Sequence, residues 1–222
     1  MHQTLEKLNL VKNKVNNIID KKQLKISTKI IVVTKTFPIS KIKGLLDNGH
    51  LHYGENKIQE AEKKWEDVKK QYINLQLHMI GKLQSNKAKK AVDLFDYIHS
   101  LDNEKLAVKI SQYQKELNKN IGLFIQLNLA DEKQKSGLTL NNLKSFYNYC
   151  VYDLKLNIVG LMCLPPIESN SDKYFKLLNQ SAKNLNLKEL SMGMSSDFES
   201  AVINGSTFLR LGTLIMGKRS IT

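Results

Sequence analysis

Long apolar runs, cysteine and arginine are scarce in this sequence of 222 residues, and each scarcity excludes a class of protein. No stretch approaches the roughly 18 uninterrupted apolar residues of a membrane span. The amino terminus also lacks the apolar core of a signal peptide, so we expect a cytoplasmic protein. The only cysteines, Cys150 and Cys163, lack C-x-x-C spacing, and no cluster of carboxylates with histidine or cysteine occurs. We therefore expect neither a disulfide framework nor a metal site.

The net charge of +13 raises the alternative of a nucleic-acid-binding protein. Two features weigh against that alternative. All but two of the 34 basic residues are lysine, the exceptions being Arg210 and Arg219, whereas arginine is suited to bidentate contacts with phosphates and bases. The lysines are also spread over nearly every segment, with no basic arm or stripe. A general compositional bias explains the charge better than a binding surface does.

Short apolar runs alternate with polar helical stretches along the whole chain. The predicted strands are Lys29–Thr36, Leu51–Gly54, Leu77–Gly81, Tyr97–Ser100, Gly122–Asn128, Asn157–Cys163, Glu189–Gly193 and Thr207–Leu211. The predicted helices between them include Ile39–Asp47, Asn56–Lys70, Glu104–Leu117, Leu140–Val151 and Asp172–Leu185. Such a series of β/α units favours a closed (β/α)8 TIM-type barrel over an open sheet. Helical periodicity over residues 2–22 adds an extra N-terminal helix, and without a linker we expect one domain over residues 1–222.

Lys35 ends the first predicted strand, where four β-branched residues in a row indicate burial on both faces. Phe37-Pro38 then breaks the strand, so Lys35 stands at a carboxyl strand end, where α/β folds place their chemistry. A lysine that loses hydration there favours its neutral amine, the form that makes a Schiff base. The alternative is a lysine that extends into solvent.

Polar residues follow two further strands. Asn56 comes after the second strand and either reaches the barrel mouth or caps the next helix. His78 lies on the third strand, where a single histidine is typical of a buried core group but is also a candidate for the site. After the fifth strand the charged segment Asp131–Gly137 either covers the barrel mouth or is solvated.

The last two strands carry a candidate phosphate site. Two segments, Leu190-Ser191-Met192-Gly193-Met194-Ser195-Ser196-Asp197 and Arg210-Leu211-Gly212-Thr213, each end a strand and enter a helix, and barrels commonly bind phosphate after strands seven and eight. Ordinary loop glycines with serine and threonine caps are the alternative. Arg210 lies within its strand, and its planar, permanently charged guanidinium suggests a planar acceptor such as a pyridine nitrogen.

Together these residues resemble the pyridoxal phosphate homeostasis protein family, whose single-domain barrels are similar to the amino-terminal domain of alanine racemase. The resemblance covers nearly the whole chain. The motifs that carry it are Val33-Thr34-Lys35-Thr36, Tyr53-Gly54-Glu55-Asn56, His78 to Lys87, Lys135-Ser136-Gly137, Gly160-Leu161-Met162, Ser191 to Ser195 and Arg210 to Thr213. Thr34 departs from the family, which usually has serine there, but a hydroxyl is retained.

The resemblance implies a role for each candidate residue. Lys35 would bind pyridoxal 5'-phosphate (PLP) as a Schiff base, Arg210 would face the pyridine nitrogen, and Lys135 would take part in cofactor exchange. The other cofactor-binding residues that it implies are Asn56 and His78 near the ring, and Ser191, Met192, Gly212 and Thr213 at the phosphate.

The function expected from the resemblance is a PLP carrier or buffer in vitamin B6 and amino-acid balance, delivering cofactor to PLP-dependent apoenzymes. An arginine beside the pyridine nitrogen keeps that nitrogen unprotonated, which weakens the cofactor as an electron sink. Racemisation also needs a second acid–base group, which alanine racemase takes from a further domain of its partner subunit. The alternative is a small PLP-dependent racemase that uses Lys35 with His78 or Tyr53. Without a recognisable partner domain we expect a monomer.

Overall fold

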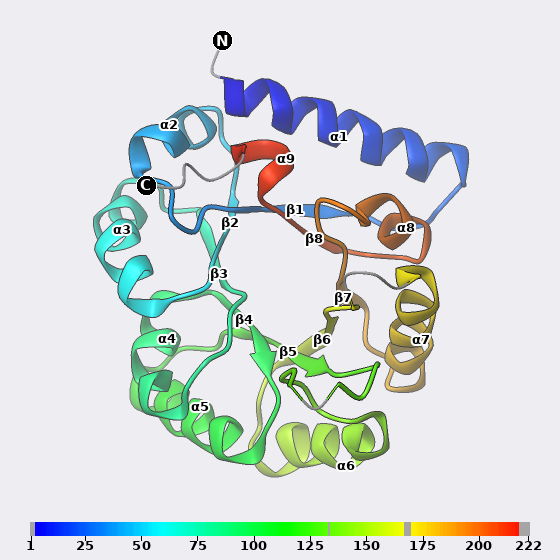
Figure 1. Cartoon of the computed structure of the whole chain (residues 1–222). Coiled ribbons are helices and arrows are strands. Elements are labelled where there is room, and N and C mark those ends of the chain that lie inside the picture. Colours follow the sequence, from blue (N-terminus) through cyan, green and yellow to red (C-terminus); the bar gives the residue numbers. More distant parts are fainter. Residues whose placement is uncertain (1–2, 133, 167–169, 218–222) are drawn as a thin grey trace.

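Eight parallel strands close into a barrel in the computed structural model, which describes residues 3–132, 134–166 and 170–217. Each strand pairs with its neighbours in chain order, and the last strand closes the ring against the first (Figure 1). The strands are β1 Lys29–Val33, β2 His52–Glu55, β3 Gln76–Met79, β4 Tyr97–Leu101, β5 Gly122–Leu127, β6 Ile158–Cys163, β7 Glu189–Ser191 and β8 Phe208–Leu211. The predicted TIM-type barrel is confirmed, and every predicted strand overlaps an observed one.

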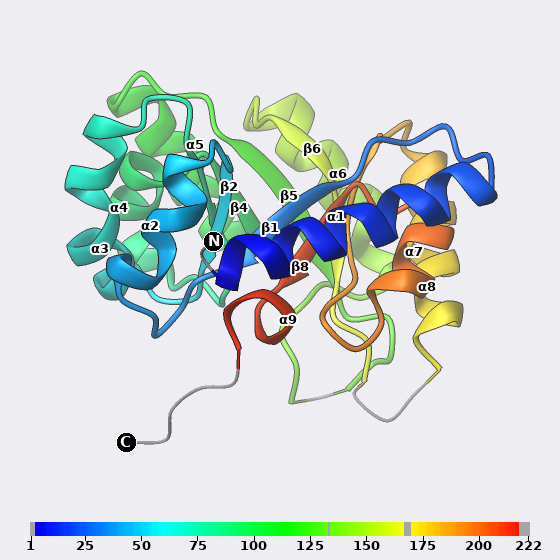
Figure 2. The same cartoon turned by 90° about the horizontal axis from the view of Figure 1, so that it is seen from above.

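Helices surround the barrel on the outside (Figure 1). They are α1 Gln3–Lys21, α2 Ile39–Asp47, α3 Ile58–Gln71, α4 Ala88–Leu94, α5 Glu104–Glu116, α6 Leu143–Asn148, α7 Ser171–Asn184, α8 Phe198–Ile203 and α9 Thr213–Met216. The extra helix α1 precedes β1 and contacts α2, α8 and α9, so that it crosses the seam where the first and last strands meet (Figure 2).

Two apolar layers hold the barrel together. The larger layer lies between strands and helices and includes Tyr53 of β2 and Trp65 of α3, both fully buried. The smaller layer includes Ile31 of β1, Phe124 of β5 and Phe208 of β8. Because successive strand residues point to opposite faces, each strand contributes to both layers, which explains the continuous apolar runs in the sequence.

Some local features differ from the sequence-based prediction. β1 ends at Val33 rather than Thr36, because the chain turns there: the amide of Phe37 donates to the carbonyl of Thr34 at 3.1 Å, and Thr36 has a φ of 68°. The helix α4 and the 3-10 turn Ser85–Lys87 before it were not predicted. Lys35 therefore lies in the turn directly after the strand rather than within it.

Cys150 and Cys163 are both buried free thiols, and burial raises the pKa of each to about 12. Among the helices of the described ranges, none combines the length and the apolar character that crossing a membrane requires.

Candidate functional site

A cavity of about 470 Å³ opens at the carboxyl ends of the strands. It contains five of the residues predicted from sequence: Lys35, Asn56, Arg210, Gly212 and Thr213. Met194, Ser195 and Ser196, from the candidate phosphate segment after strand seven, also line it, and so do Val33, Ile80 and Leu164, which were not predicted as site residues. The position of the two serines after strand seven is the feature on which that prediction rested.

The turn that carries Lys35 is held from both sides. Lys35 itself is half-buried, between Thr34, which is fully buried, and Thr36, which is exposed. The Thr34 carbonyl accepts a hydrogen bond from Lys64 at 2.9 Å, and the Thr36 amide donates to the Glu60 carboxylate. A φ of 68° is costly for a residue with a branched Cβ, so these contacts maintain a backbone shape that the sequence alone does not favour.

A buried carboxylate anchors the same turn. Glu55, at the end of β2, is fully buried, and its Oε1 accepts from Thr34 Oγ1 at 2.7 Å, Lys64 Nζ at 2.9 Å and Trp65 Nε1 at 3.0 Å. Lys64 completes its three donors with Glu60 at 3.0 Å. One ammonium group thereby ties β1, β2 and α3 together immediately behind Lys35.

Asn56 is placed by close packing against the next strand end. A Cβ on Gly81 would lie 2.3 Å from the Asn56 carbonyl oxygen, so only glycine allows this approach. The side-chain Oδ1 of Asn56 is buried and has no hydrogen-bond partner among the described residues. A buried polar atom without a partner carries a free-energy cost, which a ligand donor in the cavity would remove.

Arg210 is a buried cation held by neutral groups. Its side chain is 4% exposed, and its two terminal nitrogens donate to Ser191 Oγ at 2.5 Å and to the Cys163 carbonyl at 2.8 Å. Burial lowers the pKa of Arg210 to about 10, so the group stays charged at neutral pH. Within the described part of the chain the guanidinium makes no ion pair with a carboxylate. An anionic or electron-rich ligand in the cavity would supply the missing partner.

Small and hydroxyl-bearing residues form the wall beside Arg210. Gly212 and Thr213 lie where β8 enters α9, and Ser195 faces them, with its hydroxyl 3.5 Å from the amide of Leu214. Gly193 has a different role from the ligand approach that its motif suggested. Its φ is 93°, and a Cβ there would lie 2.5 Å from the Cβ of Ala201, so helix packing already requires glycine.

Three predicted site residues do not line this cavity. Ser191, Met192 and His78 are all fully buried. The Ser191 hydroxyl is bonded to Arg210 and His99, the Met192 amide donates to the Phe208 carbonyl at 3.2 Å, and both ring nitrogens of His78 are bonded to other histidines. Their direct contact with a ligand remains a prediction.

Lys135 lies in an adjoining cavity of about 340 Å³ that shares Asn56, Ile80 and Leu164 with the first. Its ammonium forms an ion pair with Glu132 at 2.6 Å. The predicted segment around it therefore does border the barrel mouth, although Lys133 lies outside the described residues.

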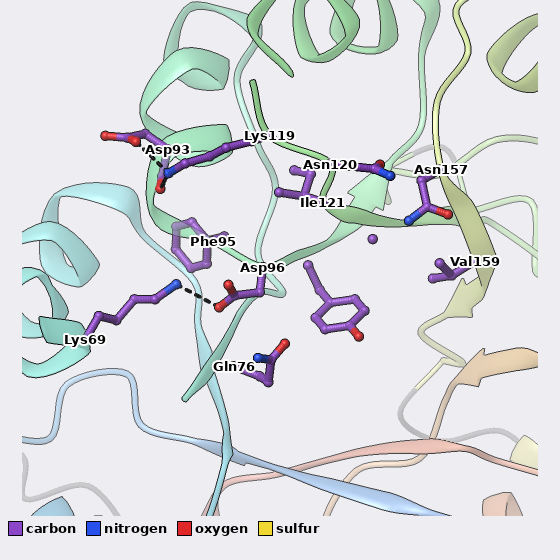
Figure 3. Close-up of a pocket in the computed structure, with 12 residues that line it drawn as sticks. Lys69, Gln76, Asp93, Phe95, Asp96, Lys119, Asn120, Ile121, Asn157 and Val159 are labelled. Atoms are coloured by element: carbon purple, nitrogen blue, oxygen red, sulfur yellow. Dashed lines mark hydrogen bonds and ion pairs between the residues drawn. The ribbon is translucent and has the colours of Figure 1, made fainter. Parts of the chain in front are cut away.

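The opposite mouth of the barrel has its own cavity, of about 390 Å³, where β3 to β6 begin (Figure 3). Its charged side chains bond to each other: Lys69 pairs with Asp96 at 2.8 Å, and Lys119 with Asp93 at 2.6 Å. In the portion of the chain that the structure describes, no three His, Cys, Asp or Glu side chains are grouped to hold a metal ion. By contrast, the cavity at the carboxyl ends of the strands combines Lys35, the buried cation Arg210 and several hydroxyl groups. This combination suits a small anionic ligand that contains a carbonyl group.

Comparison with known proteins is consistent with this geometry. The family model described as alanine racemase, N-terminal domain, matches residues 9–220. The chain is 38% identical to the pyridoxal phosphate homeostasis protein of Synechocystis over 87% of this chain and 92% of that protein. It is 36% identical to the protein of the same name from Aquifex aeolicus, over 86% of this chain and 87% of the other.

Solved structures give the same result. PipY of Synechococcus elongatus, solved with PLP bound, is 33% identical, with a TM-score of 0.85 over 97% of this chain and 100% of that one. A protein of unknown function from Bifidobacterium adolescentis is 26% identical, with a TM-score of 0.89 over 96% of this chain and 94% of the other.

Proposed function

This chain belongs to the pyridoxal phosphate homeostasis protein family, and we propose that it holds PLP in the cavity at the carboxyl ends of its strands. The observation that carries the proposal is that Lys35, in the turn after the first strand, and Arg210, on the last strand, line one cavity. When bound, PLP supplies an aldehyde, a pyridine ring and a phosphate ester. We assign the protein to intracellular PLP homeostasis as a carrier and buffer of the cofactor, with effects on vitamin B6 and amino-acid balance.

Each group of the cofactor has a matching group in the cavity. The Lys35 amine would join the aldehyde carbon with loss of one water, a reaction that needs the neutral amine. Arg210 would donate toward the pyridine nitrogen, and Asn56 would line the ring. Gly212 and Thr213 would hold the phosphate through backbone and hydroxyl donors.

The cavity fits such a ligand. Its volume of about 470 Å³ lies within the range usual for small-molecule sites. In the described part of the chain, Arg210 is a buried cation bonded to a hydroxyl and a carbonyl, and the Asn56 Oδ1 is buried without a hydrogen-bond partner. Both features are costly in the free protein and are relieved by a ligand with acceptors and donors at these places.

A carrier accounts for the site better than a racemase does. A racemase needs acid–base groups on both faces of the reacting carbon. The two candidates from sequence do not reach the cavity: Tyr53 is fully buried against Trp65, with ring centroids 5.0 Å apart, and His78 is fully buried within the barrel. Arg210 beside the ring nitrogen further disfavours protonation of that nitrogen.

We assign Lys135 to cofactor exchange. Its cavity adjoins that of Lys35 through three shared residues, so a ligand leaving Lys35 on that side passes the Lys135 amine. Delivery to PLP-dependent apoenzymes, a cytoplasmic location and a monomeric state complete the proposal; co-purification with an apoenzyme and size-exclusion chromatography test the first and the last.

The experiment for the proposed function is a titration of purified protein with PLP, followed by absorbance and dialysis. We expect one equivalent to be retained by the wild type and by Lys29→Ala, and none by Lys35→Ala. Lys29 is the matched control because it begins the same strand at the opposite mouth. Equal retention by the wild type and Lys35→Ala would refute the proposal.

A further inference from the structure

Three histidines from neighbouring strands form a hydrogen-bonded row inside the barrel. His52 of β2 bonds through Nδ1 to Nε2 of His78 of β3 at 3.0 Å, and His78 Nδ1 bonds to Nε2 of His99 of β4 at 3.0 Å. His78 and His99 are fully buried and His52 is half-buried at the amino-terminal mouth. We call His52, His78 and His99 the histidine row; the PLP binding proposed above assigns no role to His52 or His99, and the contact of His78 with the ring stays a prediction.

The row ends on the arginine of the cofactor cavity. His99 Nδ1 lies 2.8 Å from Ser191 Oγ, and the same oxygen accepts from Arg210 at 2.5 Å. Ser191 is fully buried. One serine hydroxyl therefore joins the histidine row to a residue that lines the cavity.

The rings of the row are fixed by stacking. His99 stacks on Phe124 with centroids 4.2 Å apart and planes 16° apart, and His78 stacks on Tyr97 at 4.7 Å and 6°. The rings of His78 and His99 thus have a single orientation, set both by a hydrogen bond at each ring nitrogen and by a stacked aromatic neighbour.

The direction of the hydrogen bonds follows from the arginine. A guanidinium only donates, so the Ser191 oxygen is an acceptor toward Arg210. The serine hydrogen then goes to its other partner, His99 Nδ1, since the reverse direction would leave a buried hydroxyl hydrogen without an acceptor. His99 consequently carries its own hydrogen on Nε2 and donates to His78 Nδ1, and His78 donates from Nε2 to His52 Nδ1.

The electrostatics favour this arrangement. Burial lowers the pKa of His78 and His99 well below the usual value, and the positive charge of Arg210 lowers that of His99 further. Neutral rings place an unprotonated nitrogen, and not a second positive charge, behind the serine that holds the arginine.

We propose that His99 is a positioning residue for Arg210: by accepting the Ser191 hydrogen it orients the serine lone pair that fixes the guanidinium in the cofactor cavity. This inference rests on the proposed function only for its effect on PLP. The fixed guanidinium and the hydrogen position on each ring are properties of the protein without cofactor.

The first test uses cofactor-free protein. In nitrogen-15 NMR of labelled histidine we expect neutral rings with hydrogen on Nε2 for His78 and His99; a hydrogen on Nδ1 of His99, or a charged His99, would overturn the proposal. Arg210 should show slowly exchanging guanidinium signals, assigned against Arg219→Lys because the sequence has only these two arginines. These signals should disappear in His99→Phe and persist in His99→Asn, whose amide oxygen can replace Nδ1 as acceptor.

The second test is a double-mutant cycle on PLP binding. Ser191→Ala and His99→Phe should each raise the dissociation constant about tenfold and shift the absorption band of the bound cofactor. Combined, they should have no larger effect than either alone, because His99 acts through Ser191. Additive effects, or a failure of His99→Asn to restore binding relative to His99→Phe, would refute the positioning role.

The outcomes separate the two proposals. If the wild type retains no PLP, the proposed function fails while the NMR result still decides the role of His99. If PLP binds at Lys35 but the His99 and Ser191 effects add, only the positioning role fails. Should a variant not fold, as thermal unfolding will show, the hydrogen positions in the wild type remain decisive.

Discussion

The two mouths of the barrel differ in how their charged groups are satisfied. At the amino-terminal mouth lysines pair with carboxylates of the protein: Lys29 with Glu189 at 3.3 Å and Lys69 with Asp96 at 2.8 Å (Figure 3). At the carboxyl-terminal mouth, the cation Arg210 is held by a hydroxyl and a carbonyl, and Asn56 Oδ1 has no partner in the described chain. The lysines of the first mouth are thus neutralised by carboxylates of the protein, although Glu189 Oε2 lacks a hydrogen-bond partner among the described residues, whereas the buried cation of the second mouth has no carboxylate partner in the described chain.

This difference shows which charges serve binding and which serve stability. Charged groups of both kinds lie close to Lys35. The buried Lys64–Glu55 pair joins two oppositely charged groups of the protein and holds the turn, while Arg210 lines the cavity and has no carboxylate partner among the described residues. Charge density alone does not separate them; the identity of each partner does.

Removing Lys64 should give the largest effect, a loss of stability, because Lys64 belongs to the charges that pair within the protein. Lys64→Met leaves the fully buried Glu55 carboxylate without its ammonium, and we expect a loss of about 3–5 kcal/mol in the free energy of unfolding. Urea denaturation measures it. Lys70→Met is the matched control, because its pair with Asp67 is exposed, and it should leave stability unchanged. Equal effects of the two substitutions would contradict the account.

Arg210→Lys should weaken PLP binding, because Arg210 belongs to the charges that face the ligand cavity. Lysine keeps the positive charge, but it lacks the planar guanidinium that donates to Ser191 and to the Cys163 carbonyl while also facing the cavity. The affinity for PLP should therefore fall about thirtyfold. Equilibrium titration by absorbance measures the change. Lys69→Met, at the amino-terminal mouth, should leave PLP affinity unaltered. An unchanged affinity and spectrum in Arg210→Lys would show that the guanidinium does not matter.

Acid should act on the amino-terminal mouth through His52. Burial and the nearby Lys29 lower the pKa of His52 from 6.5 to about 4, so the folded protein disfavours its charged form. The stability that the neutral ring provides is complete above pH 6.5 and is lost as the pH falls toward 4. The His52→Asn variant keeps an acceptor for His78 but has no titrating ring. Between pH 6.5 and 4 its free energy of unfolding should therefore fall less than that of the wild type, by on the order of 2 kcal/mol. Parallel stability curves for wild type and variant would contradict this assignment.

Thr213→Ala should give the smallest effect. Thr213 is exposed at the wall of the cavity, and removing its hydroxyl should weaken PLP binding by about 1–2 kcal/mol, the usual size for a hydrogen bond to a charged group. Thr207→Ala is a contrasting change, since the Thr207 hydroxyl accepts from the Leu190 amide at 2.7 Å within the sheet. It should reduce stability and leave the affinity for PLP unchanged.

Most of the barrel follows from the sequence because strand burial leaves a direct signature. The apolar runs over residues 30–33 and 123–125 cover both faces of their strands, and they predict strands without knowledge of their neighbours. The helix Ala88–Leu94 was not among the predicted ranges because it is short. Its two lysines also stand among two alanines and one valine, which gives little helical periodicity.

The site was predictable only in part, for a geometric reason. Lys35, Arg210, Gly212 and Thr213 are near strand ends, and strand ends meet at one mouth in any parallel barrel. Whether a side chain enters the cavity depends on its position in the pleat and on the register of the neighbouring strands, neither of which is visible in one sequence. Ser191 illustrates this limit: the hydrogen bonds of its hydroxyl to Arg210 and His99 could not be foreseen, and its predicted contact with the phosphate stays a prediction.

The central claim, that the carboxyl-terminal mouth binds the cofactor through Lys35, is tested most directly by borohydride reduction of PLP-loaded protein followed by peptide mass mapping. Reduction makes the link between cofactor and lysine permanent, so the modified residue can be identified. We predict one pyridoxyl group, on Lys35, with Lys29 and Lys69 of the opposite mouth unmodified. A label spread over surface lysines, or placed at the amino-terminal mouth, would contradict the account.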